Sequence, residues 1–472
     1  MKIAFLNPQG NFDRDDSYLT EHPDFGGQLV YVKEVALALG RLGVEVDVIT
    51  RRIDDPDWPG FAAPLDDFGE QADRVRIVRL DFGGPQFLPK ETLWPHLPVF
   101  VDAIRGFYGE RMIDYATAHY ADGGWAGVLL KQGAGVPFTF TGHSLGAQKI
   151  DKLGVDAGNL DAMDARYRFS RRIEAERRAM RGADTVITST DAERREQYAH
   201  PLYHGAIDPA DDARFDVIPP GVNERIFHAD ADGDDPGFAA TLAASAPADA
   251  PCVVVSSRLD PKKNVGGLVE AWVAEPALHR RARLALFVRG AADPFADDAA
   301  LGAGERAELA PIRDRVLAAG LRDRVLFVDA RSQRQLATAY RHFARAGSVF
   351  ALPSLFEPFG LAPIEAAACG LAVAATGNGG PSEIFADGSG VLFDPADPAD
   401  IARGLIEALD RQVELAPAGR ERVRARYTWR RTAERYLGRI EANLATPPHR
   451  TVDAGSELDA LERLTAWVAR AR

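Results

Sequence analysis

Short apolar runs alternate with stretches of helical periodicity in the first part of the chain. Residues 3–7 form an apolar run that is typical of a strand buried on both faces of a parallel sheet. After a polar loop and Gly26-Gly27, apolar residues recur at helical spacing from Val32 to Leu42, and Gly43 predicts the end of this helix. Residues 44–50 are a second apolar run. This order of elements predicts a doubly wound α/β layer.

The same order returns after the turn signal Pro219-Pro220-Gly221. The pattern predicts a helix over 265–272 and strands at 252–256, 284–289, 325–328 and 349–352. We therefore expect an α/β protein of two Rossmann-like domains, 1–221 and 222–451, that face a deep cleft, the default place for a ligand. The tail carries Leu458, Leu461, Leu464, Trp467 and Val468 at helical spacing. Residues 452–472 are expected to rejoin the first domain; a plain terminal helix is the alternative.

Composition narrows the classes of partner. A chain of 472 residues is too long for one core, which agrees with two domains. The net charge of −13 argues against a nucleic-acid partner, and a phosphorylated ligand would need a local basic pocket. Cys252 and Cys369 stand far apart, which argues against a disulfide framework or a zinc site. With no signal-peptide pattern and no apolar run of about 20 residues, we expect a cytoplasmic protein without a membrane partner.

The richest chemistry lies between Ser354 and Gly380. Glu357 and Glu365 flank a loop that runs into an apolar helix. A loop that opens a helix presents free backbone N–H groups, on which a phosphate can bind. The two carboxylates could accept hydrogen bonds from sugar or ribose hydroxyls. This segment predicts a site for a nucleotide sugar.

Two further motifs offer partners for phosphate. Arg258 and Lys263 follow the predicted strand 252–256, and the carboxyl ends of such strands are where α/β proteins bind ligands. Their charges could stabilise a departing diphosphate, although a solvated charge run is the alternative. Gly26-Gly27 precedes a helix, where an anion is favoured. A tight turn explains these glycines equally well, and the G-x-G-x-x-G dinucleotide pattern is absent.

Two features of the first half leave alternatives open. Residues 142–146 read G-H-S-L-G, which matches the nucleophile elbow of serine hydrolases with Ser144 as nucleophile. The competing interpretation is that His143, after a strand, faces the ligand cleft. Lys90, Lys149 and Arg171-Arg172 could together hold a second phosphate, on the side of a sugar acceptor. Taken one by one, they are ordinary surface cations.

Several segments carry a family resemblance. The chain resembles the GT-B retaining glycosyltransferases of family 4, and among them the sucrose and sucrose-phosphate synthases. The E-P-F-G-L-A-P-I-E run is specific for the superfamily, whereas GGQLVYV and TGHSLGAQK narrow the resemblance to these synthases. The other matching segments are FLNPQGNFD, VIPPGVN, SSRLDPKKN, TGNGGPSEI and the tail RYTW.

The resemblance implies transfer of glucose from UDP-glucose to fructose 6-phosphate, with retention at the anomeric carbon and without a required metal or other cofactor. It implies catalytic roles for His143, Arg258, Lys263 and Glu357. It further implies donor-binding roles for Gly27, Asn223, Arg258, Lys263, Phe359, Gly360, Leu361 and Glu365. On the acceptor side it implies Gly26, Gly27, Gln28, Lys90, Tyr120, Lys149 and Arg172.

Other readings stay open at this point. Within the class, the donor could be another nucleotide sugar, such as GDP-mannose, or the acceptor another sugar phosphate. Outside it, a serine hydrolase and a non-catalytic sugar-binding protein are the alternatives. A phosphatase that consumes the phosphorylated product is a possible partner protein.

Overall fold

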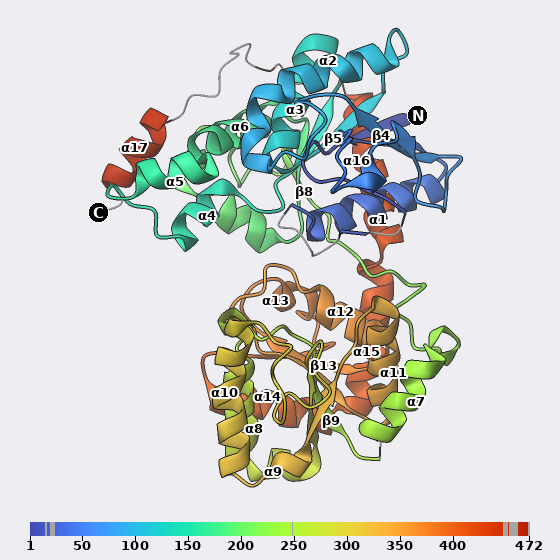
Figure 1. Ribbon diagram of the computed structural model, residues 1–472, viewed down its shortest axis with the longest axis vertical. Coiled ribbons are helices and arrows are strands. Elements are labelled where there is room, and N and C mark those ends of the chain that lie inside the picture. The colour runs from blue at the N-terminus through green and yellow to red at the C-terminus, as the bar shows by residue number, and fades with distance from the viewer. Residues whose placement is uncertain (15–16, 19–23, 248, 447–451, 453–460, 471–472) are drawn as a thin grey trace. The chain divides into compact units, whose positions relative to one another are not determined.

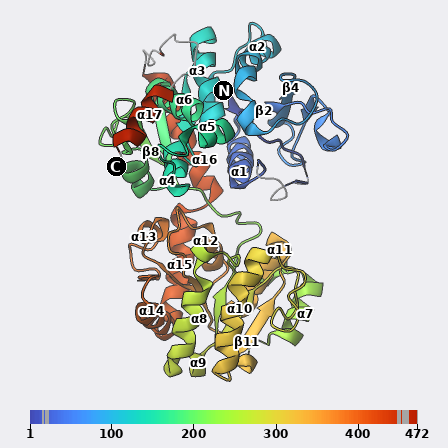
Figure 2. The ribbon, with the colours of Figure 1, turned by 60° about the vertical axis from the view of Figure 1, so that its left-hand side comes forward.

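The computed structural model describes residues 1–14, 17–18, 24–247, 249–446, 452 and 461–470. The chain forms two compact units, Met1–Pro219 with Thr432–Arg472, and Pro220–Arg431. Each unit is an α/β layer built on its own sheet, as the alternation of apolar runs and helical periods predicts (Figures 1 and 2). The predicted division after the turn at 219–221 therefore agrees closely with the first boundary between the units.

An eight-stranded sheet in the order β3-β4-β2-β1-β5-β6-β7-β8 forms the first unit. All neighbouring strands are parallel except β3 and β4. The strands are β1 (Lys2–Leu6), β2 (Glu45–Arg51), β3 (Leu65–Asp66), β4 (Val75–Leu80), β5 (Tyr115–His119), β6 (Phe138–Thr141), β7 (Thr185–Thr188) and β8 (Phe215–Val217). The central strands are buried on both faces, which explains their continuous apolar runs.

Helices cover both faces of this sheet (Figure 1). The main core packs α2 (Leu97–Tyr108), α3 (Tyr120–Ala134) and α6 (Phe169–Gly182) against one face. The other face carries α1 (Gly27–Arg41) and α16 (Trp429–Ala445). Successive residues of a strand point to opposite faces. In β6, Phe140 accordingly joins the core under α3, while Thr141 meets Tyr436 of α16. Smaller elements are α4 (Gly146–Lys152), α5 (Leu160–Tyr167), α17 (Leu461–Arg470) and the short helices η1 (Pro59–Phe61), η2 (Lys90–Thr92), η3 (Trp94–His96), η4 (Glu193–Gln197) and η5 (Pro201–Tyr203).

The second unit contains a six-stranded sheet, entirely parallel, in the order β11-β10-β9-β12-β13-β14. Its strands are β9 (Cys252–Val255), β10 (Arg283–Phe287), β11 (Val325–Val328), β12 (Val349–Leu352), β13 (Ala372–Thr376) and β14 (Val391–Phe393). One face packs against α8 (Val265–Ala274), α9 (Pro276–Arg281), α10 (Ala303–Ala318) and α14 (Pro398–Asp410). The other packs against α7 (Pro236–Ser245), α11 (Gln333–Arg345), α12 (Leu361–Ala368) and α15 (Gln412–Arg426). Figure 1 shows β9 and β13 between these two helical layers. The remaining elements are α13 (Gly380–Ile384), η6 (Ala231–Gly233), η7 (Pro261–Lys263) and η8 (Arg322–Arg324).

The chain rejoins the first unit earlier than the expected residue 452, at Thr432. The physical reason is a set of polar contacts along α16. The Thr432 hydroxyl donates to the Pro219 carbonyl at 2.8 Å, Tyr436 meets Thr141 at 3.0 Å, and Asn443 donates to the Tyr115 hydroxyl at 2.7 Å. The assignment of 432–446 to the second domain is thus corrected.

The last helix also belongs to the first unit. Leu464 and Val468 of α17 are buried in the core beside α6, and Trp467 packs against it. These residues accordingly fall in the first unit, where the tail is expected to return. Leu458 lies outside the described residues.

Both sheets have a point where the strand order reverses. In the first unit it lies between β1 and β5, and in the second between β9 and β12. At such a point the loops that leave the two strands diverge to opposite faces of the sheet, which opens a crevice at the carboxyl ends where α/β proteins bind ligands. The candidate site residues follow these strands.

Candidate active site

The loops after β9 and β12 meet at the switch point of the second unit. Lys263 Nζ lies 2.7 Å from Glu357 Oε2, and both side chains are largely shielded from water. The Leu355 N–H donates to the Lys262 carbonyl at 3.0 Å, which ties the loops together through the backbone. Two motifs that stand about 90 residues apart in the sequence therefore form one site, as neighbouring parallel strands require.

Two glycines after β13 hold the loop of Glu357. The Glu357 N–H donates to the Asn378 carbonyl at 3.0 Å, and its carbonyl accepts from the Gly380 N–H at 2.8 Å. A Cβ atom on Gly379 would lie 2.1 Å from the Glu357 carbonyl oxygen, and one on Gly380 would lie 2.2 Å from that of Phe359. Such distances are sterically forbidden, so only glycine permits this approach of the two backbones. The TGNGG segment thus positions the carboxylate.

The start of α12 has the features expected of a phosphate-binding helix. Gly360 precedes it with a φ of 109°, a conformation that side chains rarely adopt. Leu361, the first residue of the helix, is 39% exposed. Phe359 is buried, and its ring packs 6.1 Å from that of Tyr427, which anchors the loop. Glu365 is half-buried one turn further on, and burial raises its pKa to about 7. A nucleotide whose hydroxyls donate to this carboxylate would stabilise its ionised form.

Two predicted donor residues are less constrained. The Arg258 side chain is exposed and forms no ion pair with any described residue. Asn223 is half-buried and accepts the Arg225 N–H at 3.1 Å, so it closes a turn in this structure. The structure brings together Lys263, Glu357 and the start of α12. Arg258 lies in the same loop after β9 as Lys263, with its side chain exposed.

The first unit contains a pocket in which three cationic side chains converge. Four of the predicted acceptor residues line it, namely Lys90, Tyr120, Lys149 and Arg172. Its other lining residues are Gln9, Glu91, Trp94, Asp122 and Tyr167. The structure places these four residues, which span 83 positions of the chain, in one cavity, and their roles stay a prediction.

The three cations of this pocket differ in their partners. Lys90 Nζ lies 2.5 Å from a carboxylate oxygen of the buried Asp24. Arg172 donates to Glu176 at 3.0 Å, and its guanidinium stacks 4.6 Å from the centre of the Tyr120 ring. Lys149 lies 4.2 Å above the Tyr167 ring and has no carboxylate partner among the described residues. Burial, together with the charges of Arg172 and Lys90, lowers its pKa. Its ammonium group is therefore the one best placed to gain from an incoming anion.

The glycine loop and Gln28 lie at the switch point of the first unit. Gly26 precedes α1 and Gly27 begins it, and a Cβ atom on either would meet no atom within 4 Å. These glycines leave open space beside the helix start. Gln28 donates from its amide to the Asn7 side chain at 2.8 Å, which fixes it at the end of β1. The space and the helix N-terminus fit the predicted acceptor and phosphate contacts.

His143 is held by a second histidine that the sequence reasoning missed. Its Nε2 lies 3.0 Å from Nδ1 of His119, and the other nitrogen of His119 lies 2.9 Å from the Thr117 hydroxyl. Burial lowers the pKa of His143 to about 3, so both rings are neutral at physiological pH. His143 has a φ of 56° in a tight turn closed by the Ser144 N–H and the Gly142 carbonyl. Strained backbone of this kind is typical of functional sites.

The hydrolase alternative fails on the geometry around Ser144. The strained residue of the turn is His143, whereas a nucleophile elbow strains the serine. Among the described residues, no histidine nitrogen lies within hydrogen-bond distance of the Ser144 hydroxyl, so no triad forms. The side chain is exposed, and its carbonyl accepts a hydrogen bond from Arg172. The G-x-S-x-G match is a coincidence of spacing.

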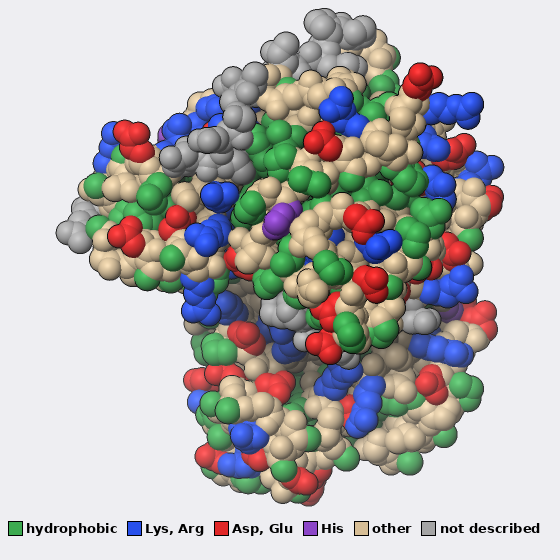
Figure 3. Space-filling model, turned by 45° about the horizontal axis from the view of Figure 1, so that its top comes forward, with side chains coloured by type: hydrophobic (Ala, Val, Ile, Leu, Met, Phe, Trp, Pro, Cys, Tyr) green, Lys and Arg blue, Asp and Glu red, His purple; other side chains and the backbone are tan. Residues whose placement is uncertain are grey.

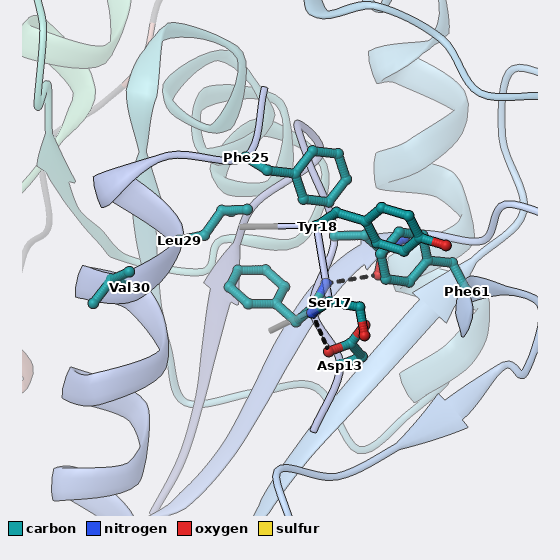
Figure 4. A pocket seen from close by; sticks show the side chains of 9 residues that line it. Asp13, Ser17, Tyr18, Phe25, Leu29, Val30 and Phe61 are labelled. Carbon is teal, nitrogen blue, oxygen red and sulfur yellow. Dashed lines mark hydrogen bonds between the residues drawn. The ribbon is translucent and has the colours of Figure 1, made fainter. Parts of the chain in front are cut away.

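An aromatic cluster supports the segment before Gly26 (Figure 4). Phe25 stacks on Phe61 at 5.8 Å, Tyr18 lies 5.2 Å from Phe61, and their rings point toward one another. The Ser17 N–H donates to Asp13 at 3.1 Å. Leu29 and Val30 of α1 line the same small pocket. The cluster is a local core that anchors the start of α1.

The buried partners of the predicted site residues are what the sequence reasoning missed. Asp24, Glu176 and His119 are all buried and pair with predicted site residues. Asp122 lines the acceptor pocket. The one sequence signal was position, because His119 ends β5 and Asp122 lies three residues further on. Ligand residues are common at this place in an α/β sheet.

The surface charge, metal-binding groups and membrane-spanning helices were also considered for the described residues. Acidic and basic side chains are interspersed on the face that Figure 3 shows, so no large basic surface is visible there. Within the described ranges, no three or more His, Cys, Asp or Glu residues are grouped so that they could hold a metal ion. No helix of the described chain is long and apolar enough to cross a membrane.

Comparison with known proteins defines the class. Residues 26–221 match the glycosyl transferase 4-like domain, and residues 243–426 match the group 1 glycosyl transferases. The Anabaena protein Alr3699/HepE, solved in complex with UDP-glucose, is 17% identical with a TM-score of 0.58, and the match covers 94% of this chain and 100% of that one. This likeness shows the fold. The protein is a GT-B glycosyltransferase.

Relatives at higher identity define the family. A probable sucrose-phosphate synthase of Thermosipho melanesiensis is 43% identical over 93% of this chain and 96% of that protein. The sucrose-phosphate synthase of Thermosynechococcus elongatus, a solved structure, is 29% identical with a TM-score of 0.66, over 94% of this chain and 99% of that one. A Vicia faba relative is 31% identical over 98% of this chain, which spans 49% of its length. The chain belongs to the sucrose-phosphate synthase family.

Proposed function

We propose that this protein transfers glucose from UDP-glucose to fructose 6-phosphate, with retention, to give sucrose 6-phosphate and UDP. The observation that carries the proposal is the pocket in which Lys90, Lys149 and Arg172 converge. A protein of net charge −13 needs such a local basic cavity to hold a sugar phosphate. The donor site of the second unit and the family membership support the other half of the reaction.

The donor would bind at the switch point between β9 and β12. Its diphosphate would meet Arg258, Lys263 and the N–H groups at the start of α12, including that of Leu361. Glu365 would accept hydrogen bonds from the ribose, and Glu357 from the glucose. Lys263 already lies 2.7 Å from Glu357, so one contact links the phosphate and sugar ends of this site.

Bond breaking leaves negative charge on the diphosphate, and Arg258 and Lys263 would stabilise it in the transition state. The acceptor hydroxyl would attack from the face that the diphosphate leaves, and the leaving phosphate would take its proton. His143 would contact the transferred sugar through Nδ1, since Nε2 is engaged by His119. Gly26, Gly27 and Gln28 would lie beside the acceptor and the diphosphate. On this account positioning and charge stabilisation drive the transfer, and no metal is required.

The proposed setting follows from the chemistry. Cys252 and Cys369 are both buried and free, which suits a reducing cytoplasm. A phosphatase that removes the phosphate of the product would draw the reaction forward. A direct contact with such an enzyme is part of the proposal.

Product analysis tests the function. The enzyme is incubated with UDP-glucose, ADP-glucose or GDP-mannose, each paired with fructose 6-phosphate, fructose or glucose 6-phosphate. We expect mass spectrometry to show a disaccharide phosphate from UDP-glucose and fructose 6-phosphate, and NMR couplings to show an α-glucosyl linkage. Preferred use of GDP-mannose would redirect the proposal to mannosyl transfer. No transfer with any pair would refute it.

A further inference from the structure

Asp122 is a buried carboxyl group inside the pocket of the cations. It lies in the first turn of α3, is 3% exposed, and lines the cavity with Lys90, Lys149 and Arg172. Neither carboxyl oxygen has a side-chain hydrogen-bond partner among the described residues. The backbone N–H groups of Asp122 itself and of Gly123 lower its pKa only in part. Buried polar groups are nearly always paired, so this one needs an explanation.

The charges around Asp122 make an ionised form unfavourable once an anion binds. Lys90 is neutralised by Asp24, and Arg172 by Glu176. This leaves the ammonium of Lys149 as the cation of the pocket without a carboxylate partner in the described chain. Glu91 also lines the cavity, so an ionised Asp122 would add a second negative charge near Lys149 and would repel an entering phosphate dianion.

We propose that Asp122 binds the acceptor phosphate in its protonated form, donating its O–H to a phosphate oxygen, so that binding of a sugar phosphate takes up one proton. The proton comes from solvent and remains on the Asp122 carboxyl group in the complex. The inference rests on the proposed role of this pocket as the acceptor site.

The surroundings support a proton on Asp122 near neutral pH. Burial raises its pKa to about 7, and the charge of Asp24 adds to this rise. Arg172 and the two backbone N–H groups act in the opposite direction. The charged and titratable groups that face the cavity from the packed elements are Asp24, Lys90, Glu91, Tyr120, Lys149, Tyr167, Arg172 and Glu176. A bound dianion adds negative charge and favours the protonated form further.

The alternative role gives the opposite dependence on pH. An ionised Asp122 could accept hydrogen bonds from sugar hydroxyls instead. Binding would then release a proton and would tighten as the pH rises through 7. The proposed role predicts weaker binding over the same range. The sign of the pH dependence separates the two roles without any variant.

Calorimetry measures the proton directly. Fructose 6-phosphate is titrated into the intact protein, without donor, in two phosphate-free buffers that differ in ionisation enthalpy. At pH 7.5 to 8 the ligand itself is almost fully ionised, because the second pKa of a phosphate ester is about 6. We expect an uptake approaching one proton per bound molecule, and a dissociation constant that rises toward about tenfold per pH unit above pH 7.5.

Asp122→Asn provides the matched test, because the amide keeps a donor and cannot ionise. We expect binding at pH 6.5 within about threefold of the parent, no dependence on pH up to 8.5, and loss of the proton uptake. Asp161→Asn, at an exposed position in the first turn of α5, is the control and should behave as the parent.

Several outcomes would overturn the proposal. An unchanged pH slope in Asp122→Asn would assign the titration to Lys149. Proton release by the parent would assign Asp122 to the sugar hydroxyls. Should the variant fail to fold, the uptake measured on the parent still decides. Because binding is measured without turnover, bound fructose 6-phosphate with proton uptake but no transfer would refute the proposed function and leave this inference standing.

Discussion

The clearest test of the acceptor site is Lys149→Ala. The structure distinguishes this residue from the other two cations of the pocket. Removal of Lys90 or Arg172 would leave Asp24 or Glu176 buried without its cation, which typically costs about 3–5 kcal/mol of folding free energy. Lys149 has no such partner in the described chain and loses only its contact with the Tyr167 ring. Its truncation therefore reports on the ligand.

The expected magnitude follows from one charge-assisted contact. Loss of such a contact to a phosphate typically costs about 2–5 kcal/mol. Lys149 is half-buried and two other cations remain, so we expect the lower end, about 2–3 kcal/mol. This corresponds to an increase of about 30- to 150-fold in the KM for fructose 6-phosphate. The free energy of unfolding should change by about 1 kcal/mol at most, the usual worth of a cation–π contact at a site of this kind.

Steady-state kinetics at saturating UDP-glucose, with thermal unfolding alongside, measure both effects. Lys152→Ala, exposed on the same helix, is the control and should leave both KM values unchanged. With free fructose as acceptor, Lys149→Ala should differ little from the parent. An unchanged KM for fructose 6-phosphate, or an equal loss with fructose, would refute the reasoning.

Three further predictions concern the other candidate groups. Arg258→Ala should lower kcat by about 100-fold or more with an unchanged circular dichroism spectrum. The control Lys262→Ala, at an exposed neighbouring position, should keep the parent kcat, and near-normal turnover of Arg258→Ala would exclude a catalytic role for Arg258. Ser144→Ala should retain most of the transfer activity and His143→Ala should lose most of it, and the reverse order of activities would revive the hydrolase. Unfolded chains ionise Glu365 near pH 4.5 but the folded protein holds its proton to about pH 7, so this group lowers stability as the pH rises between these values. Glu365→Gln should therefore raise the free energy of unfolding at pH 8 by about 1–2 kcal/mol, because water still reaches the half-buried group, and leave it unchanged at pH 4.5. The gain would be seen as a higher melting temperature at pH 8, while UDP binding weakens; equal melting temperatures at pH 8 would contradict this.

Local pattern was sufficient for the elements that are buried on both faces. Strands β11 and β12 have the bounds that their apolar runs predict, because every position of both strands is apolar; β12 lies inside the parallel sheet and is fully buried, whereas β11 forms its edge. The end of α1 near Gly43 followed from a glycine with a φ of 89°. The donor loop was also readable, since the carboxylates, the glycine and the helix start stand within nine residues of one another.

Contacts between distant segments could not be predicted from the sequence. The return of the chain at Thr432 depends on single hydrogen bonds to Pro219, Thr141 and Tyr115. Such bonds produce no periodic pattern in the sequence of α16. Likewise, the counter-charges Asp24 and Glu176 look like ordinary acidic residues in the sequence. Only their burial beside Lys90 and Arg172 shows which cation of the pocket has no carboxylate partner among the described residues.

The sequence by itself thus determined the two α/β layers, the family and the residue types of both candidate sites, because each is a property of a local pattern or motif. Tertiary structure alone decided which of these residues meet. It joins Lys263 to Glu357, sets His119 behind His143, and places Asp122 among the cations. The physical reason is that the protonation state of a side chain depends on its burial and on the charges of neighbours from distant strands. The order of strands in the sheet brings these neighbours together, and no single segment of the sequence predicts that order.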